Sequence, residues 1–288
     1  MVRKFLHSDK EIFKKFIEKS LRNSPEGQDE GIGTIYERVV LDAYFRSLVH
    51  RYHIETVLEH PADGVTGILG INSLEFARNG CKVFLSNPIL KVVNQSLEIW
   101  RKNHLQHNVR VFVSDIDSGS LKDNCFDLVW NYCVFERFKS PSILLREMAR
   151  ISKRFILIMT QNRFNLGIYL HHLYHHIARI PWDHGYQNLM SLNRIIKICR
   201  AVKIKVLEYG TIDIPPWVDI WDMPIRGQIK KMFKPLGLEW QWALKSGEDS
   251  GTKQIHGKVL RLLADIESRL PFWFSKIHAH HFYVLGQI

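Results

Sequence analysis

Polar residues and glycines gather where the first short apolar run of this sequence ends. Glu59 closes that run, and the segment HPADGVTGILG that follows carries Gly64, Gly67 and Gly70 at intervals of three residues. Glycines let a ligand approach the backbone closely, and the amino terminus of a following helix favours negatively charged groups. A tight turn that binds nothing has the same composition. Because the spacing differs from G-x-G-x-x-G, the loop by itself is only a weak indication of a ligand site.

The same pattern continues along the chain. Polar side chains also follow the next three apolar runs: Ser86, Asn87, Ser114, Asp115, Asp117 and Asn131. A ligand with a ribose and an adenine could use such a row, with Glu59 holding a charged amino group, Asn87 meeting the ribose hydroxyls and Asp115 accepting from the adenine amine. Each residue alone could instead cap a helix or form a turn. Together they favour a ligand site.

A candidate general base lies further along, in IPWDHGYQNLM. Asp183 and His184 are neighbours there and could form a titrating pair. In the alternative interpretation, His184 and Gly185 form a helix-ending turn and Asp183 lies on the surface.

The run HHLYHH spaces its histidines as a helix would need to bind a metal. His171 with His175 and His172 with His176 have i, i+4 spacing, which is compatible with a two-histidine site. No Glu or Cys lies nearby as a third ligand, and the two pairs face about 100° apart on a helix. We therefore predict a helix packed beside the ligand site and no metal.

Short apolar runs alternate with amphipathic segments of helical length from residue 53 onward. This alternation is typical of a parallel sheet with helices on both faces. The expected strands are residues 54–59, 82–86, 109–114, 126–131 and 154–159, and the expected helices between them are residues 71–79, 89–104 and 140–150. Ligands bind such a sheet beyond the carboxyl ends of its strands, so the polar row should share one edge.

The two ends of the chain add further elements. Ser8 with Glu11 and Thr34 with Glu37 have capping-box spacing, which predicts helices over residues 9–22 and 35–51. After residue 162 we expect an amphipathic helix in SLNRIIKICRAV, a strand in KIKVLEYGTID, mainly helical structure over residues 225–275 and a closing strand in HHFYVLG. The basic and aromatic stretch SRLPFWFSKIHAHH would suit a peripheral membrane contact, or burial against the sheet.

Composition narrows the class of protein. The 288 residues are 45% hydrophobic and 24% charged, which is typical of a globular protein. No apolar run is long enough for a transmembrane segment. Four scattered cysteines suit a reducing cytoplasm. The net charge of +11 permits a nucleic-acid partner, but Lys and Arg are spread along the chain, so we favour a solvated surface.

Four segments together resemble class I S-adenosylmethionine (SAM)-dependent methyltransferases of the type 11, UbiE-like group. They are VLEHPADGVTGILG, VFLSNP, VFVSDIDSGSLKDNCFDLVWNYCVFERF and LLREMARISKRFILIMTQN. The stretch DIDSGSLKDNCFDLVWN is the most specific, since it is similar to the family pattern D-x-x-x-L-P-F-x-D-x-x-F-D-x-V. The matching residues are Leu121, Asp123, Phe126, Asp127 and Val129. Two positions depart from the family: Pro61 replaces the first glycine, and Asn87 replaces an acid.

The resemblance implies a doubly wound, Rossmann-like α/β fold with a seven-stranded sheet whose last strand is antiparallel. It also implies SAM as cofactor. By analogy, Glu59 with the turn at Asp63 and Gly64 contacts the methionine part, Asn87 the ribose, Ser114 and Asp115 the adenine, and Asn131 the edge near the sulfonium. The expected organisation is a helical extension over residues 1–52, a SAM-binding core over 53–165, and the rest of the sheet with a helical cap over 166–288.

The expected activity is in-line methyl transfer to a small-molecule or lipid-like acceptor, with Asp183 and His184 as the candidate base. Such chemistry needs an aligned acceptor and no metal. Two alternatives stay open: a catalytically inactive scaffold with a SAM fold, which the departures at Pro61 and Asn87 motivate, and an RNA methyltransferase, which the charge motivates.

Overall fold

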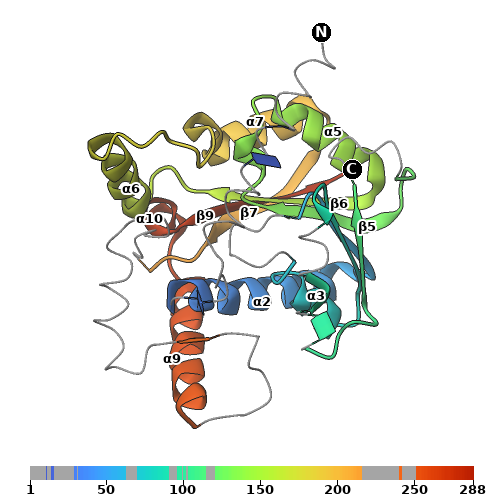
Figure 1. Cartoon of the computed structure of the whole chain (residues 1–288), viewed down its shortest axis with the longest axis horizontal. Coiled ribbons are helices and arrows are strands. Elements are labelled where there is room, and N and C mark those ends of the chain that lie inside the picture. Colours follow the sequence, from blue (N-terminus) through green and yellow to red (C-terminus); the bar gives the residue numbers. More distant parts are fainter. Residues whose placement is uncertain are drawn as a thin grey trace.

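A seven-stranded sheet forms the centre of the molecule (Figure 1). In this computed structural model, the described residues are 11, 14–15, 29–30, 32–62, 70–90, 96–98, 100–101, 103–114, 121–215, 240–241 and 251–288. The strands of the sheet are β2 (Thr56–Glu59), β3 (Lys82–Asn87), β4 (Val109–Val113), β5 (Phe126–Tyr132), β6 (Ser152–Gln161), β7 (Lys205–Ile212) and β9 (His281–Gln287). The five strands predicted up to residue 159 are confirmed, with ends that differ by no more than two residues.

The strand order is β4-β3-β2-β5-β6-β9-β7. The pairs from β4 to β6 are parallel, whereas β9 is antiparallel to both β6 and β7. The predicted doubly wound sheet with an antiparallel last strand is therefore confirmed. The direction of winding reverses between β2 and β5, and in sheets of this kind a ligand crevice opens at that point, beyond the carboxyl ends of the strands.

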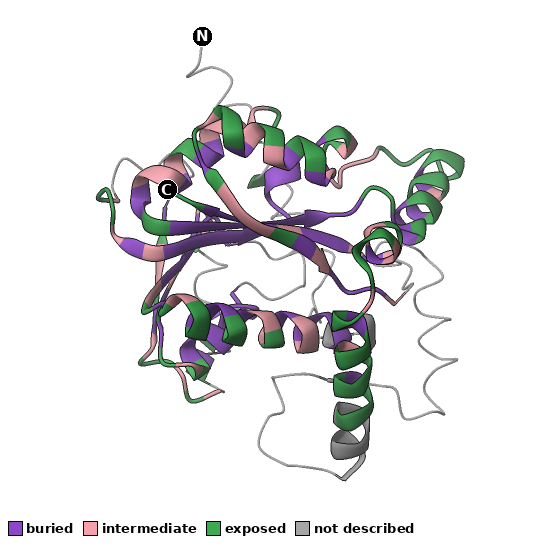
Figure 2. Cartoon of the chain, turned by 180° about the vertical axis from the view of Figure 1, so that it is seen from behind, coloured by how far each residue is buried: buried purple, intermediate pink, exposed green. Residues whose placement is uncertain are grey.

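Helices cover both faces of the sheet, as Figure 1 shows. On one face lie α2 (Ile32–Tyr52) and α3 (Leu74–Arg78), and on the other lie α5 (Pro141–Ile151) and α7 (Leu192–Ala201). Figure 2 shows the central strands largely buried between these layers, whereas the edge strands β4 and β7 are partly exposed. The near-continuous apolar runs of the strands follow from this burial on both faces. On the α2 face, the ring of Phe45 lies 4.4 Å from that of Phe76 and 5.0 Å from that of Trp130.

Two further helices lie at the carboxyl end of the sheet. α6 (Leu166–Ile177) follows β6 directly, and α10 (Phe272–His278) precedes β9. Asn165 caps α6, because its side-chain oxygen accepts from the N–H of Gly167 at 2.7 Å, and its amide donates to the carbonyl of His278 at 2.6 Å. The start of α6 is thus tied to the end of α10, beside the ligand edge.

The remaining elements are short or peripheral, apart from α9. They are β1 (Asp29–Glu30), β8 (Trp240–Gln241), α9 (Gly251–Ser268) and the 3-10 turns η1 (Phe135–Arg137) and η2 (Gln187–Leu189). β8 pairs with β1, so residues 240–241 are extended where a helix is predicted. Among the helices in the described ranges, none has the length and apolar character needed to cross a bilayer.

Several predicted features differ from the structure or fall outside it. α2 begins at Ile32, so Thr34 lies inside the helix and does not act as its amino-terminal cap. α3 is shorter than the predicted helix over 71–79, because Ser73 is its amino-terminal cap residue. Most of the predicted helix over 9–22 lies outside the described residues, and so do residues 91–95, 99 and 102 of the one over 89–104.

Candidate active site

The acid that ends β2 points into the α3 side of the crevice. Glu59 is buried, and its carboxylate accepts a 2.6 Å hydrogen bond from the hydroxyl of Ser73 at the start of α3. That hydroxyl in turn accepts from the indole N–H of Trp130 on β5 at 3.2 Å. The charge of Glu59 is therefore held rigidly at the switch point, between the ends of β2 and β5.

Asn87 joins the loops that follow three neighbouring strands. Its amide donates to the carbonyl of Ala62 at 2.9 Å and its side-chain oxygen accepts from the N–H of Ile89 at 2.8 Å. The backbone N–H of Ser114 donates to the carbonyl of Asn87 at 3.2 Å. Because the side chain of Asn87 is fully buried, it organises the edge and does not face an open crevice.

Asn131 lies on the opposite face of the sheet from Glu59, next to the loop that follows β2. Its amide lies 3.4 Å from the carbonyl of His60 and 3.2 Å from the sulfur of Met148. The imidazole of His60 is bonded to the hydroxyl of Ser86 at 2.6 Å. The side-chain oxygen of Asn131 is buried and has no hydrogen-bond donor within the described part of the chain. A buried acceptor of this kind fits a donor group supplied by a ligand or by water.

Four of the seven predicted cofactor residues thus share the carboxyl edge of the sheet: Glu59, Asn87, Ser114 and Asn131. The other three, Asp63, Gly64 and Asp115, lie outside the described residues. The described set offers a carboxylate on one face of the sheet, a buried unsatisfied acceptor on the other, and the backbone groups of the loops at this edge. This donor and acceptor set fits a ligand with a charged amino group and polar nucleoside groups.

A second polar cluster lies further along the same edge. Glu37 of α2, Asp213 after β7 and His281 of β9 are all buried, and each offers a ligand atom within 4.8 Å of the others. A ring nitrogen of His281 lies 4.0 Å from the carboxylate of Glu37. Its Nε2 lies 3.0 Å from the hydroxyl of Tyr132, which extends β5 just past Asn131. Burial, followed by the nearby charge of Glu37, raises the pKa of Tyr132 well above its usual value, so this hydroxyl keeps its proton.

Hydrogen bonds to α9 hold the residues around this cluster in place. The carboxylate of Glu267 accepts from the N–H of Asp213 at 2.9 Å, from the N–H of Ile214 at 3.0 Å and from the hydroxyl of Tyr36 at 2.6 Å. Burial raises the pKa of Glu267, although those hydrogen bonds act against the rise. The end of β7 and the start of α2 are therefore fixed around the cluster.

Sequence reasoning missed this cluster. From the sequence, Glu37 is predicted to lie in a capping box and His281 in a closing strand, and no role is predicted for Asp213. The available signal was positional, since Asp213 and His281 each lie at a strand end on the ligand edge. Nothing local in the sequence brings α2 to the same place.

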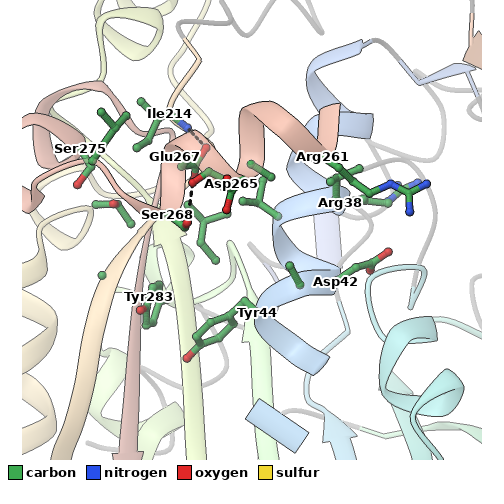
Figure 3. A pocket seen from close by; sticks show the side chains of 18 of the residues that line it. Arg38, Asp42, Tyr44, Ile214, Arg261, Asp265, Glu267, Ser268, Ser275 and Tyr283 are labelled. Atoms are coloured by element: carbon green, nitrogen blue, oxygen red, sulfur yellow. Dashed lines mark hydrogen bonds between the residues drawn. The ribbon is translucent and has the colours of Figure 1, made fainter. Parts of the chain in front are cut away.

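A groove of about 920 Å³ runs beside the cluster, between α2, the end of β7 and α9 (Figure 3). Its wall includes Ile212 and Ile214, which flank Asp213, together with Leu260 and Glu267 of α9. Arg38, Asp42, Arg261 and Asp265 add charge to the lining. The groove therefore combines an apolar wall with charged groups.

The predicted base pair lies elsewhere, in the segment after α6. The carboxylate of Asp183 is 3.5 Å from Nε2 of His184, so the two side chains do meet. His184 packs against the rings of His171 and His175, at 4.5 and 5.1 Å between centroids. The segment is docked on η1, because the N–H of Tyr186 donates to the carbonyl of Glu136 at 2.7 Å.

Strand order, winding and edge chemistry together define a class I, Rossmann-like methyltransferase fold. Three solved structures share it. The [4+2]-cyclase SpnF is 13% identical, with 85% of this chain and 80% of that chain covered and a TM-score of 0.53. A chain of the complex containing the Haloferax volcanii Trm112 methyltransferase activator is 16% identical, with 96% of both chains covered and a TM-score of 0.51. The MccD protein is 13% identical, with 86% of this chain and 96% of that chain covered and a TM-score of 0.50. At such low identity these likenesses show the fold alone. No curated protein matches the sequence.

Residues 66–155 match the family model described as "Methyltransferase domain". This part of the chain is therefore similar to SAM-dependent methyltransferase domains of the type 11 group, and that similarity implies SAM as cofactor. The match begins within the glycine segment and ends in β6, so it covers β3, β4 and β5 but not β2, whose end also borders the crevice.

Proposed function

We propose that this protein methylates the nitrogen of a small amine that carries an apolar portion. The observation that carries this proposal is the buried cluster of Glu37, Asp213 and His281 at the carboxyl edge, one step beyond the cofactor crevice. Two carboxylates and one imidazole favour an acceptor that is cationic or becomes cationic as it reacts. A neutral alcohol would gain less from them.

The cofactor is proposed to bind across the ends of β2, β3, β4 and β5. Glu59 would hold the methionine ammonium together with the turn at Asp63 and Gly64. Ser114 and Asp115 would contact the adenine. The unsatisfied oxygen of Asn131 supports a donor at this edge. Asn87, which the resemblance assigns to the ribose, would act by fixing the loop at Ala62.

When bound, SAM supplies the methyl group: its carbon–sulfur bond breaks, the electron pair stays on sulfur, and neutral S-adenosylhomocysteine leaves. The acceptor lone pair forms the new nitrogen–carbon bond. His281 is placed to remove the proton that the amine must lose, and Glu37 at 4.0 Å would stabilise the imidazolium that results. Tyr132, which keeps its proton, orients the ring of His281.

The groove between α2 and α9 supports the apolar portion of the acceptor. It shares Glu267 and the segment around Asp213 with the cluster, and Ile212, Ile214 and Leu260 form its apolar wall. A chain seated there would place its amine end at the cluster. This arrangement suits the lipid-like class of acceptor better than a nucleic acid.

Asp183 with His184 is the second candidate for the base. Their side chains lie 3.5 Å apart, and Arg137 links them to the segment after β5, since its guanidinium donates to the carbonyl of Asp183 at 3.4 Å. Replacing His281 by Gln distinguishes the two candidates, because this variant loses turnover only if His281 is the base.

We also propose a cytoplasmic location. All four cysteines, Cys81, Cys125, Cys133 and Cys199, are free thiols, which suits a reducing compartment. Fractionation of cells that express the full chain tests this assignment.

The test begins with calorimetry of S-adenosylhomocysteine on the wild type and on Asp115→Ala. Radiolabelled SAM is then offered with hexylamine and dodecylamine and with the alcohols of the same lengths. We expect micromolar binding that Asp115→Ala weakens, and label transfer to the amines, faster for the longer one. Transfer to the alcohols alone would overturn the amine assignment. A folded wild type that binds no cofactor would leave a non-catalytic scaffold.

A further inference from the structure

We infer that His171, His175 and His184 form a binding site for a divalent transition metal, of which Zn²⁺ is the first candidate. This inference is independent of the proposed acceptor. It also revises the sequence analysis, which paired His171 with His175 and found no third ligand. The third ligand is another histidine, brought back by the segment after α6.

The geometry of the first two ligands comes from α6. His171 and His175 are one helical turn apart, are 1% and 2% exposed, and place their Nε2 atoms 3.2 Å from each other. Two nitrogens bound tetrahedrally to zinc at the usual bond length lie about 3.3 Å apart. The second pair, His172 and His176, is exposed on another side of the helix. The helix therefore presents one buried pair at ligand spacing.

His184 completes the set. Its ring lies 4.5 Å from that of His171, and all three side chains offer nitrogens within 4.8 Å of one another. Trp182 packs against the three imidazoles, at 4.8 to 5.6 Å between centroids, and its indole N–H is held by the carbonyl of Gly185 at 2.9 Å. The indole covers the cluster and keeps bulk water from part of it.

Two of the three histidines also contact an oxygen atom outside the cluster, as histidines that bind a metal commonly do. Nδ1 of His175 lies 3.1 Å from the carbonyl oxygen of Pro181, which can only accept, so this nitrogen carries the proton. In the neutral ring, Nε2 then has a lone pair directed at the cluster. The carboxylate of Asp183 lies 3.5 Å from Nε2 of His184 and would orient that ring. A carbonyl and a carboxylate thus orient two of the three ligands.

The chemistry of the set limits the metal. Imidazole ligands suit Zn²⁺, Co²⁺, Ni²⁺ and Cu²⁺, whereas Mg²⁺ and Ca²⁺ prefer oxygen. Three protein nitrogens leave one position of a tetrahedron for water or another ligand. The ion would fasten the segment of residues 181–186 to α6, and that segment rests on η1 beside the carboxyl end of β5.

The test uses the full chain without a polyhistidine tag, treated with chelator and returned to metal-free buffer. Zn²⁺ is titrated by calorimetry, and bound zinc is counted by elemental analysis. The variants are His175→Gln and His184→Gln, and the matched control is the exposed pair on the same helix, His172→Gln with His176→Gln. Circular dichroism checks that each variant is folded.

We expect one zinc per wild-type and control chain, at least tenfold weaker binding in each ligand variant, and a zinc-dependent rise in Tm that the ligand variants lose. Co²⁺ should give a tetrahedral spectrum without thiolate-to-metal charge transfer, which separates this site from the cysteines. Absence of stoichiometric zinc on the wild type, or equal binding by folded His184→Gln, would overturn the site.

Discussion

The two sides of the crevice hold their polar groups in different ways. On the side proposed for the cofactor, Asn87 is bonded to backbone atoms of the neighbouring loops, and Glu59 to the cap residue of the next helix. On the side proposed for the acceptor, Glu37, Asp213 and His281 come from elements far apart in the chain and meet mainly through their side chains. The positions of the first group of residues follow from the ends of the strands alone. The second group comes together only when α2, β7 and β9 are all in place.

The largest effect that separates the two sides should come from His281→Gln. We expect kcat to fall about a hundredfold or more, because the proton acceptor is lost, while the Kd of S-adenosylhomocysteine changes little. His280→Gln is the matched control, since His280 bonds the carbonyl of Pro215 outside the cluster. If His281→Gln weakened the cofactor as much as it slowed turnover, the two sides could not be treated as separate.

Gly185→Ala should give the largest loss of stability. Gly185 has φ of +106°, and a Cβ atom there would lie 2.8 Å from the carbonyl oxygen of Glu136, so the segment must leave η1. We expect the free energy of unfolding to fall by about 3 kcal/mol. Gly80→Ala is the control: φ is +85° but nothing lies within 4 Å, so the expected loss is about 1 kcal/mol. The free energies of unfolding are measured by urea titration with chelator present, so that no bound metal contributes. If Gly185→Ala and Gly80→Ala lost the same free energy of unfolding, the contact of Gly185 with η1 would be contradicted.

Asn87→Asp tests the cofactor side. The family pattern has an acid here, but the amide of Asn87 donates to Ala62, and a carboxylate cannot. We expect the variant to lose about 1–2 kcal/mol of stability and to bind S-adenosylhomocysteine more weakly. Tighter binding would show that residue 87 turns toward the ribose when the cofactor is present.

The smallest effect should come from Asp127→Asn, at the opposite edge of the sheet. Burial alone would raise the pKa of Asp127, but hydrogen bonds from the hydroxyl and N–H of Thr56 and from the N–H of Glu55 outweigh it and hold this pKa below its usual value. Because the folded-state pKa is lowered, the stabilisation is full above pH ~4, the unfolded value, and is lost as the pH falls through the folded value.

We therefore expect Asp127→Asn to cost about 1 kcal/mol at pH 7 and progressively less below pH ~4, with kcat per folded molecule unchanged. Chemical denaturation across this pH range measures the difference. A constant difference at all pH values would mean that the charge of Asp127 does not matter. The result would also explain one residue of the family pattern as a link between the starts of β2 and β5.

The sequence predicts the sheet well, because strands buried on both faces are near-continuous apolar runs bounded by polar turns. The cofactor side follows from the same runs, since Glu59, Asn87 and Asn131 each lie at a strand end. The acceptor side and the histidine site could not be predicted in this way. His184 reaches His171 only through the fold of the segment after α6, and Glu37 meets His281 only because α2 packs under β9.

The position of β9 also has a consequence for synthesis. Among the seven strands of the sheet it is synthesised last, yet it lies between β6 and β7 and carries His281 at its start. A nascent chain can assemble β2 to β6 first, but the pairing of β7 within the described residues is with β9 and must wait for it. The cofactor crevice can thus form before the reactive cluster does. A chain that has not finished folding would hold its methyl donor without the group proposed to deprotonate the acceptor.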